Sequence, residues 1–584
     1  MNTLVIVLIA AVVLVCAYAG YGRWLTKTWG VDPNAKTPAV RLEDGKDYVP
    51  TNGWTVFAHQ FSSIAGAGPV TGAIQAAAFG WLPVLLWVLI GGVFFGAVTD
   101  FGALYASVKN DGKSMGLLIE KYIGKTGRKL FLLFCWLFCG IVIAAFADMV
   151  AGTFNAFDAE GAQVEAAFTN GAAGMVSIMF MVFAVVFGFI QKKFNFSGWK
   201  EAVIGIAFIV LSFVVGMNAP IILGKTGWSY ITFVYIFFAA VLPMWMLKQP
   251  RDYMTTFMFG AMIAGAVIGL LVAHPTMNLP VFTGFNNAKL GTMFPILFVT
   301  VACGAVSGFH SLVSSGTSSK TVENEKDMLK VGYGAMVLES LLAVLALCVA
   351  GAAAAADGTP AAGTPFQIFS RGVAGFFEMF GVPVSIATVF MTMCVSALAL
   401  TSLDAVARIG RMSFQELFSV DDMEHAEGWR KLCCNVYFST FITLVFGFIL
   451  TQIGYANIWP LFGSANQLLS ALVLATLCVF LKVTGRNNKM LFPPLVIMLC
   501  VTFTALVQRL IAMVKAISAA ASTAIPAGET TWGAVFIANG LQLILAVLLI
   551  VLGLNIVFHS VKSYTTCDAP EAKDNAKATA KANA

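Results

Sequence analysis

Long apolar segments, separated by short polar ones, run along almost the whole chain. A helix needs about 20 apolar residues to cross the hydrocarbon of a membrane, and the pattern predicts fifteen such spans. Only helices and closed barrels satisfy their backbone in lipid, and these runs are too long and too uniformly apolar for barrel strands. We therefore expect an all-α, polytopic membrane helix bundle. The expected spans are 3–20, 54–78, 81–107, 129–155, 172–190, 199–217, 229–247, 253–273, 291–317, 329–356, 381–404, 431–452, 459–481, 491–515 and 533–558.

The composition is typical of a chain whose largest surface faces lipid. Hydrophobic residues make up 59% of the 584 residues and charged residues 11%, whereas soluble domains carry roughly 25% charged residues. The sequence has no basic tract long enough for nucleic acid, and no loop is large enough for a soluble catalytic domain. Its 11 cysteines show no zinc-type spacing. We expect a protein that is not an enzyme and that needs no metal or cofactor.

The basic residues predict how the spans are oriented. Residues 1–20 carry no positive charge ahead of their apolar run, which favours a retained helix with its N-terminus outside. In that orientation the cytoplasmic loops and the C-terminal tail hold all but five of the 35 lysines and arginines, as the positive-inside rule predicts. We therefore expect the C-terminus inside. The five exceptions are Lys225, Lys289, Arg371, Arg509 and Lys515.

Two spans contain residues that interrupt a helix. The first interruption is Phe61-Ser-Ser-Ile-Ala-Gly-Ala-Gly-Pro69, where a proline and two glycines fall inside an apolar run. A second stretch, Phe309-His-Ser-Leu-Val-Ser-Ser-Gly316, resembles it and follows the Gly- and Ser-containing segment 303–308. The predicted orientation makes these two spans run in opposite directions. Two interrupted helices of opposed direction are typical of inverted-repeat transporters, whose substrate site lies at the membrane midplane.

Each interruption would expose unpaired N–H groups on one half-helix and unpaired C=O groups on the other. The N–H end carries partial positive charge and can hold a substrate carboxylate, while the C=O end can hold a cation. The alternative is that glycine and serine only allow helices to pack closely. The expected substrate-binding residues are Ser62, Ser63, Ala65, Gly66, Gly68, Gly304, Ser307, His310, Ser311, Asn466 and Gln467.

Ionisable residues inside spans mark candidate sites for ion coupling, because a charge in the membrane is costly. A neutral histidine is a natural proton acceptor, and the alternative for both His59 and His310 is a hydrogen-bonded structural role. Asp100 is the strongest carboxylate candidate, with an ion pair to a basic neighbour as its alternative. Asp148 and Glu339 also lie within spans. The expected coupling residues are His59, Asp100, His310, Thr401, Ser402 and Asp404.

Four further polar features remain, and for each a structural role stands beside or in place of a functional one. Asp404 lies one turn before Arg408, which predicts an i,i+4 pair or gate rather than a proton site. Thr401 and Ser402 would complete a sodium site together with carbonyls of the first interruption. Asn466 and Gln467 would contact a peptide-like solute or hydrogen-bond between helices. The segment 249–253 is expected to form a tight cytoplasmic turn.

The spans and interruptions also predict how the chain is divided. We expect an N-terminal helix and cytoplasmic segment at 1–52, a first inverted repeat at 53–217, two inserted helices at 218–290, a second repeat at 291–481, two accessory helices at 482–562, and a disordered cytoplasmic tail at 563–584.

Several segments together resemble the carbon starvation protein A family. The resemblance implies a bacterial inner-membrane carrier for peptides or for pyruvate, with the LeuT-like inverted-repeat core of the amino acid–polyamine–organocation transporters. The family often has a pair of histidines before the first interruption, where this chain has His59-Gln60. The matching segments are 61–69, 80–83, 100–102, 249–253, 307–317, 401–404 and 459–467.

Together these features predict a cation-coupled secondary transporter that imports small peptides or a small carboxylate such as pyruvate by alternating access. Its partners would be that substrate, a proton or sodium ion, and the lipid bilayer. An amino acid transporter is the alternative within this class. A membrane nutrient sensor or a channel is the alternative outside it. The sequence does not predict an oligomeric state.

Overall fold

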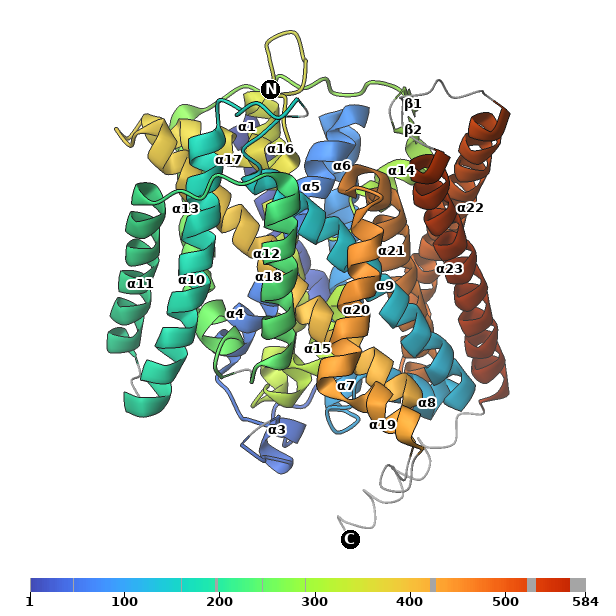
Figure 1. Ribbon diagram of the computed structural model, residues 1–584. Helices are drawn as coiled ribbons and strands as arrows, with labels where there is room; N and C mark the ends of the chain where they lie inside the picture. Colours follow the sequence, from blue (N-terminus) through green and yellow to red (C-terminus); the bar gives the residue numbers. More distant parts are fainter. Residues whose placement is uncertain are drawn as a thin grey trace.

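The computed structural model describes residues 2–45, 47–158, 160–194, 198–243, 245–288, 290–420, 427–522 and 532–567. Within these residues the chain is almost wholly helical, with one small antiparallel pair of strands, β1 (Asn286–Asn287) and β2 (Gly291–Thr292). Figure 1 shows one bundle of helices, with the chain's N-terminus, β1 and β2 at one end and α3 and α19 at the other. We call these the N-terminal end and the α3 end.

The helices follow from the apolar runs, since each run contains few residues that oppose a helix. Three of the helical runs include a short π-helical segment, at Tyr18–Gly22, Gly92–Gly96 and Leu329–Gly334. The α-helices are α1 (Thr3–Ala17), α2 (Arg23–Trp29), α3 (Pro38–Arg41), α4 (Gly53–Ile64), α5 (Ala67–Ala76), α6 (Trp81–Gly91), α7 (Ala97–Val108), α8 (Met115–Ile123), α9 (Lys125–Phe154), α10 (Ala167–Phe194), α11 (Trp199–Asn218), α12 (Lys225–Val241), α13 (Lys248–Ala273), α14 (Met293–Thr300), α15 (Gly308–Gly316), α16 (Ala335–Ala353), α17 (Pro365–Glu378), α18 (Val384–Phe418), α19 (Gly428–Cys434), α20 (Val436–Thr451), α21 (Tyr455–Val483), α22 (Phe492–Ser522) and α23 (Trp532–Thr566).

Each of the fifteen predicted runs coincides with a helix or with two consecutive helices. In the described part of the chain, eleven helices are long and apolar enough to cross a membrane, and the bent pair α19–α20 would make a twelfth. Helix α12 has 17 residues, and the pairs α4–α5 and α14–α15 are interrupted. The helical, multi-spanning architecture is therefore confirmed, while the number of fifteen crossings stays a prediction.

Both predicted interruptions are present. Helix α4 ends at Ile64 and α5 begins at Ala67, while α14 ends at Thr300 and α15 begins at Gly308. Pro69 sits in the first turn of α5, where its missing N–H costs no helical hydrogen bond. Pro69 is therefore compatible with the first turn of the second half-helix.

Helix α21 forms the centre of the bundle and holds both halves of the second broken helix. Its whole apolar stretch is buried, whereas most of α11 faces outward. A Cβ on Gly463 of α21 would lie 1.9 Å from the carbonyl oxygen of Val299 on α14. A Cβ on Gly308 of α15 would lie 2.4 Å from the Cβ of Leu469. Glycine is needed at both positions because the two backbones approach so closely.

Candidate functional site

A small cavity lies where the two broken helices meet. Its volume is about 10 Å³, which is about the room that one water molecule needs. A Cβ on Gly68 would lie 2.4 Å from the Cβ of Cys303, so the two interruptions touch each other beside it. The walls come from both broken helices and from α9, α18 and α21, and they comprise Ile64, Gly66, Gly68, Phe138, Val142, Phe146, Cys303, Phe309, Ser402, Val406, Phe462 and Asn466.

Four residues that the sequence predicts for the site line this cavity. They are Gly66, Gly68 and Asn466 from the substrate set and Ser402 from the coupling set. The apolar walls on α9, α18 and α21 could not be identified from the sequence, because phenylalanine and valine occur in a span whether they face a cavity, a neighbouring helix or lipid. The other predicted substrate residues are buried but are not among its walls: Ser62, Ser63, Ala65, Gly304, Ser307, His310, Ser311 and Gln467.

The first interruption leaves backbone donors free at the start of α5. No side chain caps this helix, and the N–H groups of Ala67 and Gly68 have no acceptor among the described residues. Pro69 follows them and has no N–H to offer. Because the N-terminus of a helix carries partial positive charge, the start of α5 is suited to hold an anionic group next to the cavity.

The second interruption is satisfied in part by side-chain amides of α21. Asn466 Oδ1 accepts hydrogen bonds from the N–H of Phe309 and from Ser307 Oγ, both at 3.1 Å. Gln467 Nε2 donates to the carbonyl oxygen of Phe298 at 2.6 Å. Of the two interpretations of these amides, hydrogen bonding between helices is the one observed. At the start of α15 the N–H of Phe309 is thus already bound by a side chain, whereas the N–H groups of Ala67 and Gly68 at the start of α5 are not.

A histidine between two carboxylates lies behind the second interruption. His310 Nδ1 is 3.1 Å from Asp100 Oδ2, and His310 Nε2 is 3.3 Å from Glu339 Oε2. The three side chains come from α15, α7 and α16, and each is 0% exposed. Asp100 thus pairs with this histidine, and within the described chain it has no Lys or Arg partner. We call Asp100, His310 and Glu339 the buried triad.

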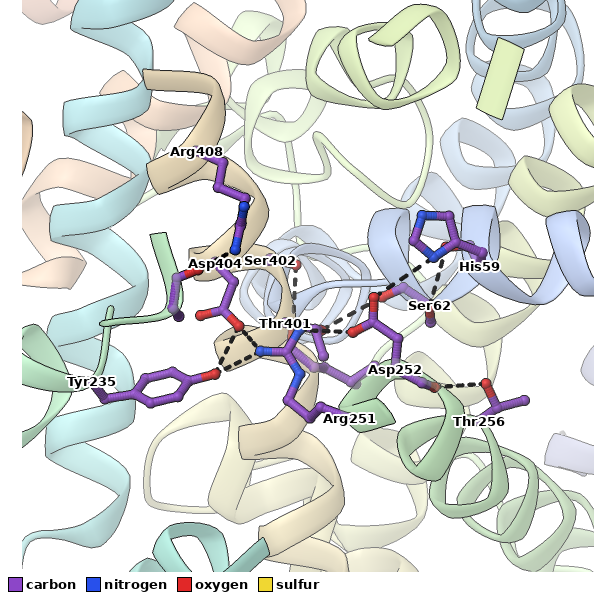
Figure 2. Close-up of polar contacts among 12 residues, drawn as sticks. His59, Ser62, Tyr235, Arg251, Asp252, Thr256, Thr401, Ser402, Asp404 and Arg408 are labelled. Atoms are coloured by element: carbon purple, nitrogen blue, oxygen red, sulfur yellow. Dashed lines mark hydrogen bonds and ion pairs between the residues drawn. The ribbon is translucent and has the colours of Figure 1, made fainter. Parts of the chain in front are cut away.

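A second buried network lies beside the first interruption (Figure 2), and it includes His59 of α4, the half-helix that begins near α3. Arg251 of α13 donates to Asp252 Oδ1 at 2.7 Å and to the hydroxyl of Tyr235 at 2.6 Å, and it also contacts the carboxylate of Asp404 on α18. Tyr235 of α12 donates to Asp404 Oδ2 at 2.7 Å. His59 of α4 places Nδ1 3.7 Å from Asp252 Oδ2. We call these five residues the arginine network.

The predicted pair of Asp404 with Arg408 is wrong. Arg251 reaches Asp404 from another helix, and Arg408 instead donates to the carbonyl oxygens of Ala239 and Leu242, at 2.6 and 2.5 Å. These carbonyls belong to the last turn of α12 and the residue that follows it, where helical acceptors lack intrahelical donors. Arg408 therefore uses its donors on the end of α12 and does not pair with Asp404 one turn away on its own helix.

The predicted turn at 249–253 is also wrong. The segment forms the first turns of α13, and Arg251 and Asp252 are buried. Pro250 favoured a turn in the sequence, but proline is equally suited to the first turn of a helix. The network that Arg251 organises was therefore missed, although two charged residues beside an apolar run were a usable signal.

Thr401 and Ser402 place α18 against the first interruption. Thr401 Oγ1 lies 3.5 Å from the carbonyl oxygen of Ser62, and both hydroxyls donate to the carbonyl oxygen of Leu398. A Cβ on Gly66 would lie 2.3 Å from Ser402 Oγ. Gly66 therefore allows α18 to pack closely against the first interruption, and it also lines the cavity.

A further ion pair joins three helices toward the N-terminal end. Lys225 Nζ, at the start of α12, is 2.8 Å from Asp148 Oδ1 on α9. The N–H of Tyr455, at the start of α21, donates to Asp148 Oδ2 at 2.8 Å. Lys225 is one of the basic residues that depart from the predicted charge bias, and its partner explains the departure.

This chain is similar to known proteins of two kinds, peptide transporters and a pyruvate/proton symporter. Peptide transporter CstA of Escherichia coli (strain K12) is 30% identical, over 86% of this chain and 80% of that protein. Peptide transporter CstA of Bacillus subtilis (strain 168) is also 30% identical, over 84% and 87%. The pyruvate/proton symporter BtsT of Escherichia coli (strain K12) is 35% identical, over 60% of this chain and 49% of that protein.

Two solved structures show distant resemblances. The manganese transporter of Eremococcus coleocola has a TM-score of 0.46 at 11% identity, over 89% of this chain and 99% of that one. MhsT in complex with L-phenylalanine has a TM-score of 0.44 at 12% identity, over 87% and 99%.

The family match covers nearly all of the predicted spans. The description of that family is carbon starvation protein CstA, and it matches residues 2–362 and 351–505. These ranges include both interruptions, the buried triad and the arginine network. The chain is a multi-pass membrane protein that belongs to the carbon starvation protein CstA family.

Proposed function

We propose that the protein is a secondary active transporter that imports a small carboxylate such as pyruvate, or a small peptide, together with a cation. The observation that carries this proposal is the contact between two broken helices at one cavity, with free backbone donors on the first. Broken helices at membrane depth are the usual binding elements of secondary transporters. The names of the relatives support the same two substrate classes.

The start of α5 is the proposed site for the substrate's carboxylate. Pyruvate and a peptide's C-terminus share that group, and the free N–H groups of Ala67 and Gly68 would donate to it. The apolar walls would surround the rest of the solute. Ser63 and Ser311 hold buried hydroxyls without a hydrogen-bond partner in the described structure, and they would serve a polar group once the site opens.

The present conformation would be a closed one. A cavity of about 10 Å³ is smaller than either substrate, so binding requires the helices around it to separate. In the orientation that the basic residues predict, the α3 end faces the cytoplasm. The arginine network would then close the cytoplasmic side of the first interruption, and the Asp148–Lys225 pair would lie toward the periplasm. Alternating access would release these two closures in turn.

The two broken helices are the proposed first spans of two inverted repeats, 53–217 and 291–481. Helix α4 begins after Thr51, which pairs with Val322 near α3, whereas α14 begins directly after β2 at the opposite end (Figure 1). Their opposed directions support the inversion. We keep 1–52 as the N-terminal helix and cytoplasmic segment, 218–290 as two helices inserted between the repeats, and 482–562 as two accessory helices. The segment 563–584 lies largely outside the described residues.

The coupling ion distinguishes two versions of this function. A proton would be held by ionisable side chains such as those of the buried triad. Sodium would need several oxygen ligands, for which Thr401, Ser402 and the carbonyl of Ser62 are the proposed set. An inner-membrane location in a bacterium, with the N-terminus in the periplasm, completes the proposal.

Uptake into proteoliposomes tests the proposal. The purified protein would be reconstituted, and labelled pyruvate and a dipeptide would each be offered under an imposed pH gradient, an imposed sodium gradient, or neither. Accumulation of either solute above its external concentration under one gradient is the expected result. Equilibration that ignores both gradients would indicate a channel, and the absence of any uptake of these solutes or of amino acids would favour a sensor.

A further inference from the structure

The buried triad has more acceptors than a neutral histidine can satisfy. Each of the two ring nitrogens of His310 lies near a carboxylate oxygen, at 3.1 Å for Asp100 and 3.3 Å for Glu339. A neutral imidazole donates from only one nitrogen, whereas an imidazolium donates from both. Asp100 Oδ1, both oxygens of Glu339 and His310 Nε2 have no hydrogen-bond partner in the described structure, so the contact of His310 with Glu339 is an ion-pair distance without a formed hydrogen bond. The geometry therefore fits a group that holds at least one proton more than a neutral histidine carries.

The charge of the triad leads to the same conclusion. Two carboxylates with a neutral imidazole would place two negative charges among fully buried side chains, which is costly without compensation. In the described chain no Lys or Arg pairs with either carboxylate. The other titratable group on this side is Cys303, whose Sγ accepts a hydrogen bond from Asn466 Nδ2 at 3.3 Å. A proton is the cation that remains to balance the charge.

A metal ion is a poor alternative at this position. Among the described residues, no group of three or more His, Cys, Asp and Glu side chains is arranged to hold one. Each nitrogen of His310 has a carboxylate oxygen within 3.3 Å, whereas a metal ligand needs one nitrogen lone pair directed at the ion. The triad is therefore better suited to share protons than to coordinate a metal.

The triad is mechanically connected to the cavity through α15. His310 follows Phe309, which lines the cavity and whose N–H is held by Asn466, another of its walls. Gly304, just before α15, packs so closely on α16 that its Cβ would lie 2.7 Å from the Cβ of Ala343, one turn beyond Glu339. Any movement of α15 on substrate binding must therefore alter the contacts of His310 with α7 and α16.

We infer that Asp100, His310 and Glu339 form one proton-binding site that couples substrate movement to proton movement, with Glu339 as its third member. The inference rests on the proposed transport function and specifies its coupling ion. Protons on the triad tie α15 to α7 and α16 by satisfying both carboxylates. Their release leaves the two carboxylates facing each other across His310 and weakens that tie. We assign the proton to the three groups together and not to one of them.

Glu339→Gln tests the inference by imitating a permanently protonated carboxyl. Proteoliposomes with this variant should lose accumulation of pyruvate or dipeptide under a pH gradient, and should lose the substrate-induced proton influx reported by an internal pH dye. They should retain exchange of labelled for unlabelled substrate, because exchange needs no release of the proton. Asp100→Asn should behave in the same way, which protects the test against one poorly folding variant.

Glu416→Gln is the matched control. Glu416 lies on α18 and pairs with Arg128, which keeps Glu120 as a second partner. This variant should accumulate substrate like the unchanged protein. If Glu339→Gln also accumulates substrate against its gradient in step with the pH gradient, the inference is overturned while the transport function stands.

Infrared difference spectra of the purified protein, recorded between acidic and alkaline buffer, test the site without transport. The unchanged protein should show the carbonyl band of a protonated carboxylic acid, and this band should shift or disappear in both Glu339→Gln and Asp100→Asn. If the carbonyl band of both variants is identical to that of the unchanged protein, the inference is overturned even if uptake is observed. Failure of all uptake with an altered band would instead contradict the proposed function.

Discussion

The carboxylate of Asp404 on α18 contacts the guanidinium of Arg251 on α13, not that of Arg408 one turn later on its own helix. Arg251 also binds Asp252 and the hydroxyl of Tyr235, so one buried cation joins α12, α13 and α18. Because His59 lies 3.7 Å from Asp252, the same cation is connected to the first broken helix. A conformational change that moves α4 must therefore disturb this network.

Removal of Arg251 should destabilise the protein strongly. Arg251→Ala takes the guanidinium away from the buried carboxylates of Asp252 and Asp404, and the loss of one partner from a buried ion pair costs about 3–5 kcal/mol. Arg251→Lys should be intermediate, because lysine lacks the planar fork that binds several oxygens at once. Unfolding of the detergent-solubilised protein measures the difference.

Arg41→Ala is the control for that experiment. Arg41 pairs with Asp111 where both side chains are about half exposed, at 49% and 51%, and such surface pairs contribute about 0–1 kcal/mol. If Arg251→Ala were no less stable than Arg41→Ala, the arginine network would not hold these helices together.

Gly66→Ala should impair both packing and substrate binding. Its Cβ would lie 2.3 Å from Ser402 Oγ, and such overpacking costs about 1–3 kcal/mol. The added methyl group also enters the cavity wall, so we expect a lower substrate affinity in binding assays. Ser402→Ala, combined with Gly66→Ala, should restore part of the stability by removing the clashing oxygen.

Gly152→Ala supplies the matched glycine substitution. A Cβ there meets nothing within 4 Å on α9, and alanine favours a helix over glycine by up to about 1 kcal/mol. If Gly66→Ala binds the substrate as tightly as Gly152→Ala does, the substrate does not bind in the cavity beside Gly66.

Asn466→Ala should weaken the second interruption. The substitution leaves the buried N–H of Phe309 and the hydroxyl of Ser307 without their shared acceptor, and an unsatisfied buried donor costs about 1–3 kcal/mol. Asn466→Asp keeps the acceptor oxygen and should recover part of the loss. Comparable unfolding of the alanine and aspartate variants would show that the hydrogen bond to Phe309 is not what holds α15.

His59 and His310 should have separable effects. His310→Ala should abolish proton-driven accumulation, because it removes the centre of the buried triad. His59→Ala should change the rate of uptake but preserve the accumulation ratio, because its side chain is 22% exposed and faces the arginine network instead. Rates and steady-state ratios in proteoliposomes distinguish the two. Loss of the ratio in His59→Ala, with exchange retained, would assign coupling to His59.

The sequence predicted the features of this protein that depend on local residue properties. The interruption before Pro69 follows from the backbone of glycine and proline, and the spans follow from their apolar length. The contact of Asp100 with His310 joins residues far apart in sequence, so only their rarity inside spans marked them as candidates. Glu339 carried the same signal but no indication of its neighbours.

Features that depend on tertiary packing could not be predicted in this way. The cavity walls Phe138 and Phe462 are ordinary apolar residues until α9 and α21 bring them together. Arg408 satisfies the end of a different helix, α12, which its spacing from Asp404 does not reveal. Local sequence therefore located the broken helices, while the partners of the charged residues needed the fold.

Uptake of labelled pyruvate and dipeptide into proteoliposomes, with and without a pH gradient that is acidic outside, tests the central claim most directly. The account predicts accumulation above the external concentration only with the gradient, accompanied by proton influx, and its loss in Glu339→Gln with exchange retained. Equal internal and external concentrations under every gradient, or accumulation that follows sodium and ignores pH, would contradict it.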